Sequence, residues 1–194
     1  DNKLLETTSY HDWLRDCAHA YDRLAAHVET IDVIGHSNGS NLALQLSQLR
    51  PIHHLILSGP YLEPGQHQQF NKFLLTTPII QDIMKTIYPF AYKGGRSKKV
   101  FGTDITTYSY VALPTESLTQ LWTLAKHSQN ITISAKLFSV LYGNYDKTGD
   151  IPYALKQFQQ ARPDVQIINY KESGHNIYEN QERQTVYQDI IKLL

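Results

Sequence analysis

The stretch Gly35-His36-Ser37-Asn38-Gly39 constrains the fold of this chain more than any other part of the sequence. A short apolar run, Ile31 to Ile34, comes directly before it. Leucine and alanine then recur at helical spacing over residues 42–49. This order predicts a strand, a tight turn and a helix, with Ser37 at the apex of the turn.

A serine at the apex of such a turn is a candidate nucleophile. Its hydroxyl projects from the turn, and the N–H of the next residue, Asn38, points from a helix N-terminus towards developing negative charge. Asn38 is therefore a candidate donor to an oxyanion. We expect both Gly35 and Gly39 to be required, because a side chain at either place would crowd the turn. By itself the five-residue motif also fits a glycine-bearing loop without catalytic function, but the flanking strand and helix favour a nucleophile.

The rest of the chain mostly alternates between strand and helix patterns. The patterns predict helices at residues 9–28 (with Ser9 as N-cap), 40–49, 115–128 and 151–161, strands at 31–34, 54–58, 136–142 and 165–170, and a terminal helix carrying Tyr178, Val186, Ile190, Ile191 and Leu194. A strand, a helix and a second strand form a right-handed parallel crossover. The fold class is therefore α/β, with a mostly parallel sheet flanked by helices.

The alternation breaks down between Tyr61 and about residue 135. Two amphipathic stretches, 67–76 and 78–88, are followed by a Gly/Lys-rich loop from Lys93 to Lys99. The segment is rich in large apolar side chains: Phe70, Phe73, Leu74, Ile79, Ile83, Met84, Tyr88, Phe90, Tyr92, Tyr108, Tyr110 and Trp122. We interpret it as a helical lid of about residues 61–135, inserted into a single domain of residues 1–194. Its apolar side chains form a small satellite core, line an acyl or aromatic substrate site, or do both.

Composition argues against several classes of function. Eighteen basic residues balance eighteen acidic ones, so neither a nucleic-acid partner nor a polybasic membrane anchor is indicated. The densest basic cluster, Lys98-Lys99 with nearby Lys93 and Arg96, is interpreted as part of a solvated loop. No apolar run is long enough to span a membrane. A single cysteine, Cys17, excludes an intrachain disulfide and fits a reducing compartment, which favours a cytoplasmic protein, although secreted bacterial proteins can also lack disulfides.

A metal site is not expected, although the chain has nine histidines. The neighbours His53 and His54 cannot point the same way on a strand, and neither an HExxH motif nor Cys/His ligand spacing occurs. No cofactor is expected either.

Two further polar loops follow predicted strands. They are Gly143-Asn144-Tyr145-Asp146 and Ser173-Gly174-His175. In open α/β sheets, functional groups gather in the loops just past the carboxyl ends of the strands, where Ser37 also stands. The chain order is serine, then aspartate, then histidine, so these three residues are candidates for nucleophile, acid and base.

Each assignment has a rival. Asp150 could replace Asp146 as the acid, but its position before Ile151-Pro152 favours a turn or a helix cap. His36 lies inside the turn and cannot readily face back onto Ser37, so we expect it to pack or hydrogen-bond beneath the turn. Asp32 is interpreted as a strand-end residue without a catalytic part.

These three motifs resemble those of the α/β-hydrolase superfamily, and within it the small lidded carboxylesterases and monoacylglycerol lipases. The resemblance spans nearly the whole chain. It implies a triad of Ser37, His175 and Asp146, and hydrolysis of a carboxylic ester or acylglycerol through an acyl-serine intermediate. A small acyl ester would be the substrate. Other acyl or carbon-carbon bond hydrolases and acyltransferases share the fold, and a non-catalytic binding protein could retain the turn.

The sequence departs from the family pattern before Gly35. The family places several strands and a helix there, with a loop that supplies a second oxyanion donor, whereas the residues before Gly35 read as one helix with a short lead. The first strand would then have an unpaired edge. Three explanations are open: this chain is a fragment or lacks disordered residues, a second chain supplies the missing strands, or the fold is a reduced variant. We favour the first explanation.

Overall fold

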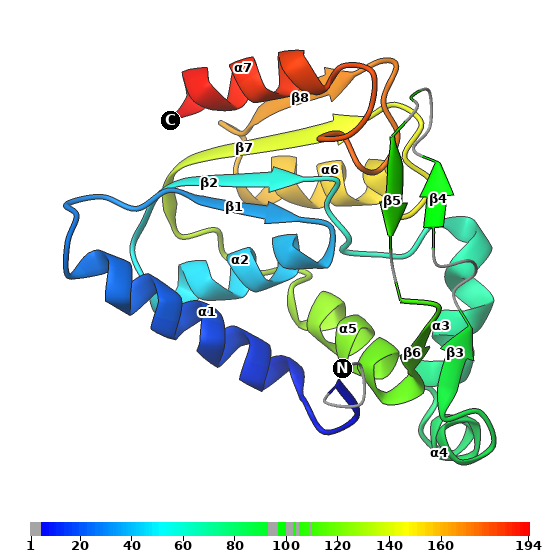
Figure 1. Cartoon of the computed structure of the whole chain (residues 1–194). Coiled ribbons are helices and arrows are strands. Elements are labelled where there is room, and N and C mark those ends of the chain that lie inside the picture. The colour runs from blue at the N-terminus through cyan, green and yellow to red at the C-terminus, as the bar shows by residue number, and fades with distance from the viewer. Residues whose placement is uncertain (1–4, 93–96, 100–102, 104, 109) are drawn as a thin grey trace.

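The computed structural model describes residues 5–92, 97–99, 103, 105–108 and 110–194. A four-stranded sheet with strand order β1-β2-β7-β8 lies at its centre (Figure 1). The strands are β1 (Val33–His36), β2 (Ile52–Ser58), β7 (Ala135–Gly143) and β8 (Gln166–Tyr170). All three strand pairs are parallel, as expected from the crossover pattern. Their carboxyl ends therefore meet at one edge of the sheet, where the loops bearing the candidate site residues begin.

Helices cover both faces of this sheet (Figure 1). On one face, α1 (Tyr10–Ala25), α2 (Asn38–Leu49) and α6 (Ile151–Ala161) share a core with β2 and β7. On the other face, α7 (Arg183–Leu193) packs against β2, β7 and β8. Side chains of β2 alternate between the two cores, because Leu55 and Leu57 belong to the first and Ile56 to the second. All three are fully buried.

The first helix and strand differ slightly from their predicted ranges. Helix α1 begins after Ser9, whose hydroxyl accepts the N–H of Asp12 while the Asp12 carboxylate accepts the N–H of Ser9, a capping box. The helix ends at Ala25, short of the predicted residue 28. Val28, whose spacing continued the helical pattern, is 44% exposed and so has no core to cover. Strand β1 runs to His36 and leads directly into the turn.

The terminal helix was predicted to carry Tyr178, and this was wrong, because α7 begins only at Arg183. In the preceding loop, the N–H groups of Glu179 and Arg183 close separate turns onto Asn176 O and Asn180 O, and side chains bond to the backbone before Tyr178. Asn180 Oδ1 accepts the N–H of Gly174 at 2.5 Å, and Glu182 Oε2 accepts the N–H of Glu172 at 2.8 Å. Such bonds hold the backbone in a non-helical path. Val186 and Ile190 are in the helix and buried, as predicted.

Between β2 and β7 the chain forms three helices and two short antiparallel ribbons. The helices are α3 (Gln69–Thr76), α4 (Pro78–Ile87) and α5 (Thr115–His127), with a 3-10 turn at Gln66–Gln68 before them. The ribbons pair β3 (Phe90–Tyr92) with β6 (Ala112–Pro114), and β4 (Ser97–Lys99) with β5 (Thr106–Tyr108). Of the loop predicted from Lys93 to Lys99, residues 93–96 lie outside the described part. The remainder is strand β4 rather than loop, because it finds a partner strand at Thr106–Tyr108.

This segment has a small core of its own. Tyr61, Leu75 and Trp122 are buried together, with Met84, Leu118 and Leu121 packed against them. Many of its other large apolar side chains are exposed, among them Phe70 (70%), Ile79 (77%), Tyr92 (76%) and Tyr108 (77%). No helix in the described ranges has the length and apolar character needed to cross a bilayer.

Candidate active site

The turn between β1 and α2 holds Ser37 in a strained backbone conformation, with φ +55° and ψ −123°. Such a combination is rare for residues with a side chain and is found at functional turns. Two hydrogen bonds support it. The N–H of Ser37 donates to Ser58 O at the end of β2, at 2.9 Å, and Ser40 Oγ donates to Gly35 O at 3.0 Å. The conformation is therefore fixed by the sheet on one side and by the helix on the other.

The two glycines of the turn differ in what they tolerate. A Cβ on Gly35 would lie 2.6 Å from Gly39 O and 2.8 Å from Ser40 Cα, so close packing of strand and helix requires a glycine there. A Cβ on Gly39 would meet nothing within 4 Å. The expectation that a side chain at Gly39 would crowd the turn was therefore wrong. Gly39 lies in the first turn of α2, where its Cα faces open space rather than the strand.

Ser37, His175 and Asp146 come together at the carboxyl edge of the sheet. His175 Nε2 lies 2.8 Å from Ser37 Oγ, and His175 Nδ1 lies 2.8 Å from Asp146 Oδ2. Each follows a different strand, since Ser37 follows β1, Asp146 follows β7 and His175 follows β8. The imidazole side chain is 22% exposed, whereas the carboxylate is completely buried. The three side chains form one continuous series of hydrogen bonds from the partly buried serine to the fully buried acid.

The Asp146 carboxylate has a partner for each oxygen. Oδ2 accepts from His175, and Oδ1 accepts the N–H of Thr148 at 2.8 Å. Gly59 packs against this pair, with φ +49°, and a Cβ there would lie 3.2 Å from His175 Nδ1 and 3.4 Å from Asp146 Oδ2. A buried carboxylate with both oxygens bonded keeps one orientation, so it also fixes the imidazole that it contacts.

The loop that carries His175 is held by Glu182 and Asn180, which the sequence analysis did not single out. Ser173 Oγ donates to Glu182 at 2.9 Å, and the Gly174 N–H bonds to the buried side chain of Asn180. A Cβ on Gly143, the last residue of β7, would lie 2.2 Å from Gly174 O. The backbone that leads into the acid loop is therefore in direct contact with the histidine loop. Gly143, Ser173 and Gly174 carried a sequence signal as parts of the two motifs, whereas Asn180 and Glu182 carried none.

His36 lies beneath the turn, as predicted. Its Nδ1 lies 3.1 Å from both the carbonyl oxygen and the hydroxyl of Ser58, and Tyr178 OH donates to the same hydroxyl at 2.7 Å. The ring centroids of His36 and His175 are 5.1 Å apart. Burial, together with the neighbouring His175, lowers the pKa of His36 to about 4. His36 is therefore neutral at pH 7 and adds no positive charge beside His175.

The rival candidates have structural roles. Asp150 caps α6, since its carboxylate accepts the N–H of Tyr153 at 3.0 Å. Asp32 Oδ1 accepts the N–H of His54 and lies 2.9 Å from His53 Nδ1. His54 is buried, with its two ring nitrogens directed to Leu193 O and Ser139 Oγ. Within the described residues, no group of three His, Cys, Asp or Glu side chains is placed to bind a metal ion.

Comparison with protein-family models and with curated protein sequences found no match to this chain. Solved structures do match. One of the metagenome-derived lipolytic enzymes LipS and LipT is 11% identical, with a TM-score of 0.77 over 100% of this chain and 76% of that chain. The Paleococcus ferrophilus monoacylglycerol lipase is 13% identical, with a TM-score of 0.70 over 95% and 74% of the two chains.

A soluble variant of the Saccharomyces cerevisiae monoglyceride lipase, in complex with a substrate analogue, is 18% identical, with a TM-score of 0.71 over 96% and 69% of the two chains. The chain has the α/β-hydrolase fold. Since these similarities extend over almost all of the chain, the fold expected from three short motifs is confirmed. In this α/β-hydrolase fold, β1 stands at one end of the described sheet, with β2 as its neighbour.

Proposed function

We propose that this chain is a serine hydrolase that cleaves a carboxylic ester or an acylglycerol through an acyl-Ser37 intermediate. The observation that carries the proposal is the hydrogen-bonded series from Ser37 Oγ through His175 to the buried carboxylate of Asp146, with 2.8 Å at each step. The strained backbone of Ser37 adds support, because strain of this kind collects at functional sites.

The geometry assigns a part to each side chain. Neutral His175 accepts the proton of Ser37 at Nε2 while Oγ attacks the acyl carbonyl carbon and forms a tetrahedral intermediate. As the intermediate collapses, His175 returns that proton to the departing alcohol. The Asp146 carboxylate accepts the hydrogen bond from Nδ1, holds the imidazole in the required tautomer and stabilises the imidazolium. Water then attacks the acyl-serine by the same sequence of proton transfers, releasing the carboxylic acid and Ser37.

The negative charge that develops on the carbonyl oxygen in the tetrahedral intermediate must be stabilised by hydrogen-bond donors. Asn38 is the first residue of α2, so its N–H has no acceptor within the helix and lies at the positive end of the helix dipole. We assign it one oxyanion contact. Its side chain is held in place, because Asn38 Oδ1 accepts from Asn41 Nδ2 at 3.2 Å and the same amide donates to Tyr61 O at 2.8 Å.

We further propose that the segment of residues 61–135 acts as a lid and receives the apolar part of the substrate. A cavity of about 650 Å³ lies within it, a size typical of small-molecule sites. Its walls are mostly apolar and aromatic: Leu74, Leu75, Met84, Tyr88, Phe90, Ala91, Tyr92, Leu113, Leu118 and Trp122, with the polar residues Gln68, Asn71 and Thr115. Gln68 links the cavity to the loop after β2 through a 2.9 Å hydrogen bond from Tyr61 OH.

Labelling with a fluorophosphonate probe tests the nucleophile. The protein should form an adduct, and Ser37→Ala should abolish it. The exposed Ser134, changed to alanine, serves as the matched control and should leave labelling intact. Adduct formation that persists in Ser37→Ala would overturn the assignment.

A series of p-nitrophenyl esters from acetate to palmitate tests the reaction and the lid. Hydrolysis should depend on Ser37 and should favour some acyl lengths over others. Met84→Trp, which adds bulk to the cavity, should raise KM for the longer esters and leave acetate almost unchanged. If protein that reacts with the fluorophosphonate probe hydrolyses none of these esters, the esterase function is excluded.

A further inference from the structure

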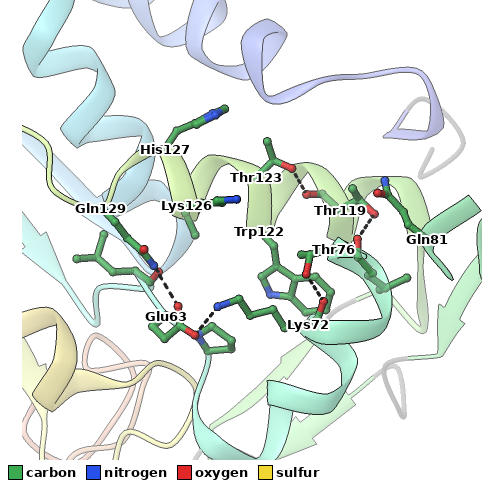
Figure 2. A pocket seen from close by; sticks show the side chains of 14 residues that line it. Glu63, Lys72, Thr76, Gln81, Thr119, Trp122, Thr123, Lys126, His127 and Gln129 are labelled. Carbon is green, nitrogen blue, oxygen red and sulfur yellow. Dashed lines mark hydrogen bonds and ion pairs between the residues drawn. The ribbon is translucent and has the colours of Figure 1, made fainter. Parts of the chain in front are cut away.

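A second cavity, of about 430 Å³, opens between α3, α5 and the loop after β2 (Figure 2). Its walls do not include Ser37, Asp146 or His175. The floor is apolar and well buried, since Leu62, Leu75, Trp122 and Ala125 are each at most 6% exposed. Trp122 and Leu75 also form part of the larger lid cavity, so they separate the two spaces.

The polar groups of this second cavity are unevenly distributed. In Figure 2, Glu63 and Gln129 lie at one end, Gln81 and Thr76 at the other, and the indole of Trp122 between them. A cavity with an apolar middle and polar groups at its ends fits an amphipathic ligand better than a fully polar one.

Glu63, the one acidic side chain in the cavity wall, already has an ion-pair partner and hydrogen-bond donors. Glu63 forms an ion pair with Lys72, accepts from Gln69 at 3.2 Å and accepts from Gln129 at 3.0 Å. Its charge is therefore balanced by Lys72, whose ammonium still has donors to spare, because it carries three. Glu63 does not bar an anion from this end of the cavity.

Lys126 supplies an unbalanced positive charge. It lines the cavity from the last turn of α5 and makes no ion pair with any residue in the described ranges. The other ionisable wall residue, His127, lies 2.9 Å from Tyr10 OH through its Nδ1. With Lys72 and Glu63 cancelling, Lys126 leaves the cavity with a net positive charge at pH 7.

The threonine side chains of the cavity wall have no hydroxyl hydrogen to offer a ligand. The hydroxyls of Thr76, Thr119 and Thr123 each donate to a carbonyl four residues earlier in their own helix. A ligand lying along this wall meets mainly methyl groups and the indole. Recognition by charge is therefore confined to the end that holds Lys126.

We propose that this cavity is a second binding site for a small amphipathic carboxylate. The carboxylate lies against the Lys126 ammonium, within reach of Lys72, and a hydrocarbon or aromatic body lies along Trp122. This site does not require Ser37, so it stands or falls independently of the hydrolase function proposed above.

Tryptophan fluorescence with sodium octanoate as the probe tests the site. The chain has two tryptophans, Trp13 and Trp122, so a Trp13→Phe background reports from Trp122 alone, which borders both cavities. Octanoate should cause a saturable change. Lys126→Gln should weaken its apparent affinity by about two- to fivefold, because the lost charge contact is made by an exposed lysine. Lys156→Gln, at an exposed position of α6, should leave the affinity unchanged.

Two further measurements decide where octanoate binds. Octanol, which has the same body without the charge, should bind at least tenfold more weakly, and protein blocked at Ser37 by a fluorophosphonate should still bind octanoate. In 1H–15N spectra of the unaltered sequence, octanoate should shift the amides of residues 62–64 and 123–129. Shifts confined to residues near Ser37 and His175, loss of binding after the block, or equal affinity for octanol would each overturn the proposal. None of these outcomes bears on whether Ser37 is the nucleophile.

Discussion

The loops at the carboxyl edge of the sheet and the segment of residues 61–135 use their side chains in opposite ways. At the sheet edge, polar side chains are buried and bonded: Asp146 is inaccessible and has a partner for each carboxylate oxygen. In the inserted segment, apolar side chains are exposed. Helix α4 has no buried residue, and Ile79, Ile83 and Ile87 are 77%, 51% and 61% exposed along one side of it.

This contrast has a physical basis. A series of two hydrogen bonds through three side chains works only when each group keeps its orientation, and burial among backbone contacts provides that. A segment that binds an apolar ligand must instead have apolar surface that is exposed and a cavity that its own side chains do not fill. We therefore expect changes at the sheet edge to have large effects, and changes on the outer side of α4 to have small ones.

The largest effect is expected at the acid. Asp146→Asn should lower kcat for a Ser37-dependent ester by about 10⁴-fold, because an amide at this place favours the wrong tautomer of His175. The protein should stay folded. Asp150→Ala is the matched control, since it removes the α6 cap and should cost about 1 kcal/mol of stability with little change in kcat. Equal kinetic losses in both variants would contradict the assignment of Asp146.

The next largest effect is expected where the backbone before Asp146 contacts the loop of His175. Gly143→Ala should destabilise the fold by about 3 kcal/mol or more, because the new Cβ would lie 2.2 Å from Gly174 O and 2.4 Å from Ser173 O, both backbone atoms. Gly39→Ala should instead raise stability by about 0.5–1 kcal/mol, since the site is open and alanine favours helix. Urea unfolding of both variants measures the difference, and a stable Gly143→Ala protein would show that the loops can separate.

A smaller effect is expected from pH through His36. Its pKa is about 4 in the folded protein and 6.5 when unfolded, so the unfolded chain binds more protons between these values and stability falls as pH drops through this window. Because of this residue, the free energy of unfolding at pH 5 should be lower than at pH 7.5 by on the order of 2 kcal/mol. Urea unfolding at both pH values should show the loss in the unaltered protein and a reduced loss in His36→Gln. The same pH dependence in both proteins would show that His36 is not the source.

The smallest effect is expected on the outer side of α4. Ile83→Ala should change the free energy of unfolding by less than about 0.5 kcal/mol, because the side chain is half exposed and alanine is the better helix former. Thermal unfolding measures it. A loss of 2 kcal/mol or more would mean that this side of α4 is covered in solution, and the contrast with the sheet edge would no longer hold.

Sequence reasoning was most successful where a local rule applies. The turn at Ser37 is recognisable because a strand, two glycines and a helix must follow in order, and α6 follows directly from Asp150 and Pro152 at its start. The crossover rule then makes the strands parallel, so the loops after β1, β7 and β8 must share one edge. The positions of Ser37, Asp146 and His175 after three of these strands therefore indicated that their side chains meet at this edge.

Where local sequence patterns are ambiguous, contacts between distant residues determine where a helix or strand begins and ends. Helical spacing continued through Val28 and included Tyr178. The first helix ends earlier, because no core covers Val28. The last helix begins later, because the backbone around Tyr178 forms separate turns, such as the one closed by the bond from the Glu179 N–H to Asn176 O. The ribbon of Ser97–Lys99 depends on a partner at Thr106–Tyr108 that no short-range pattern marks.

By itself, the sequence determined the order of the four sheet strands and their flanking helices, the fold class and the three side chains at the sheet edge, because these depend on spacing and chain order. Only the tertiary structure decided that Gly39 has room for a side chain while Gly143 does not. It alone brought Leu62 of the loop after β2 into one cavity with Trp122 and Lys126 of α5, and paired Glu63 with Lys72 of α3. Free space and charge balance arise here between residues on different elements, and no local pattern records them.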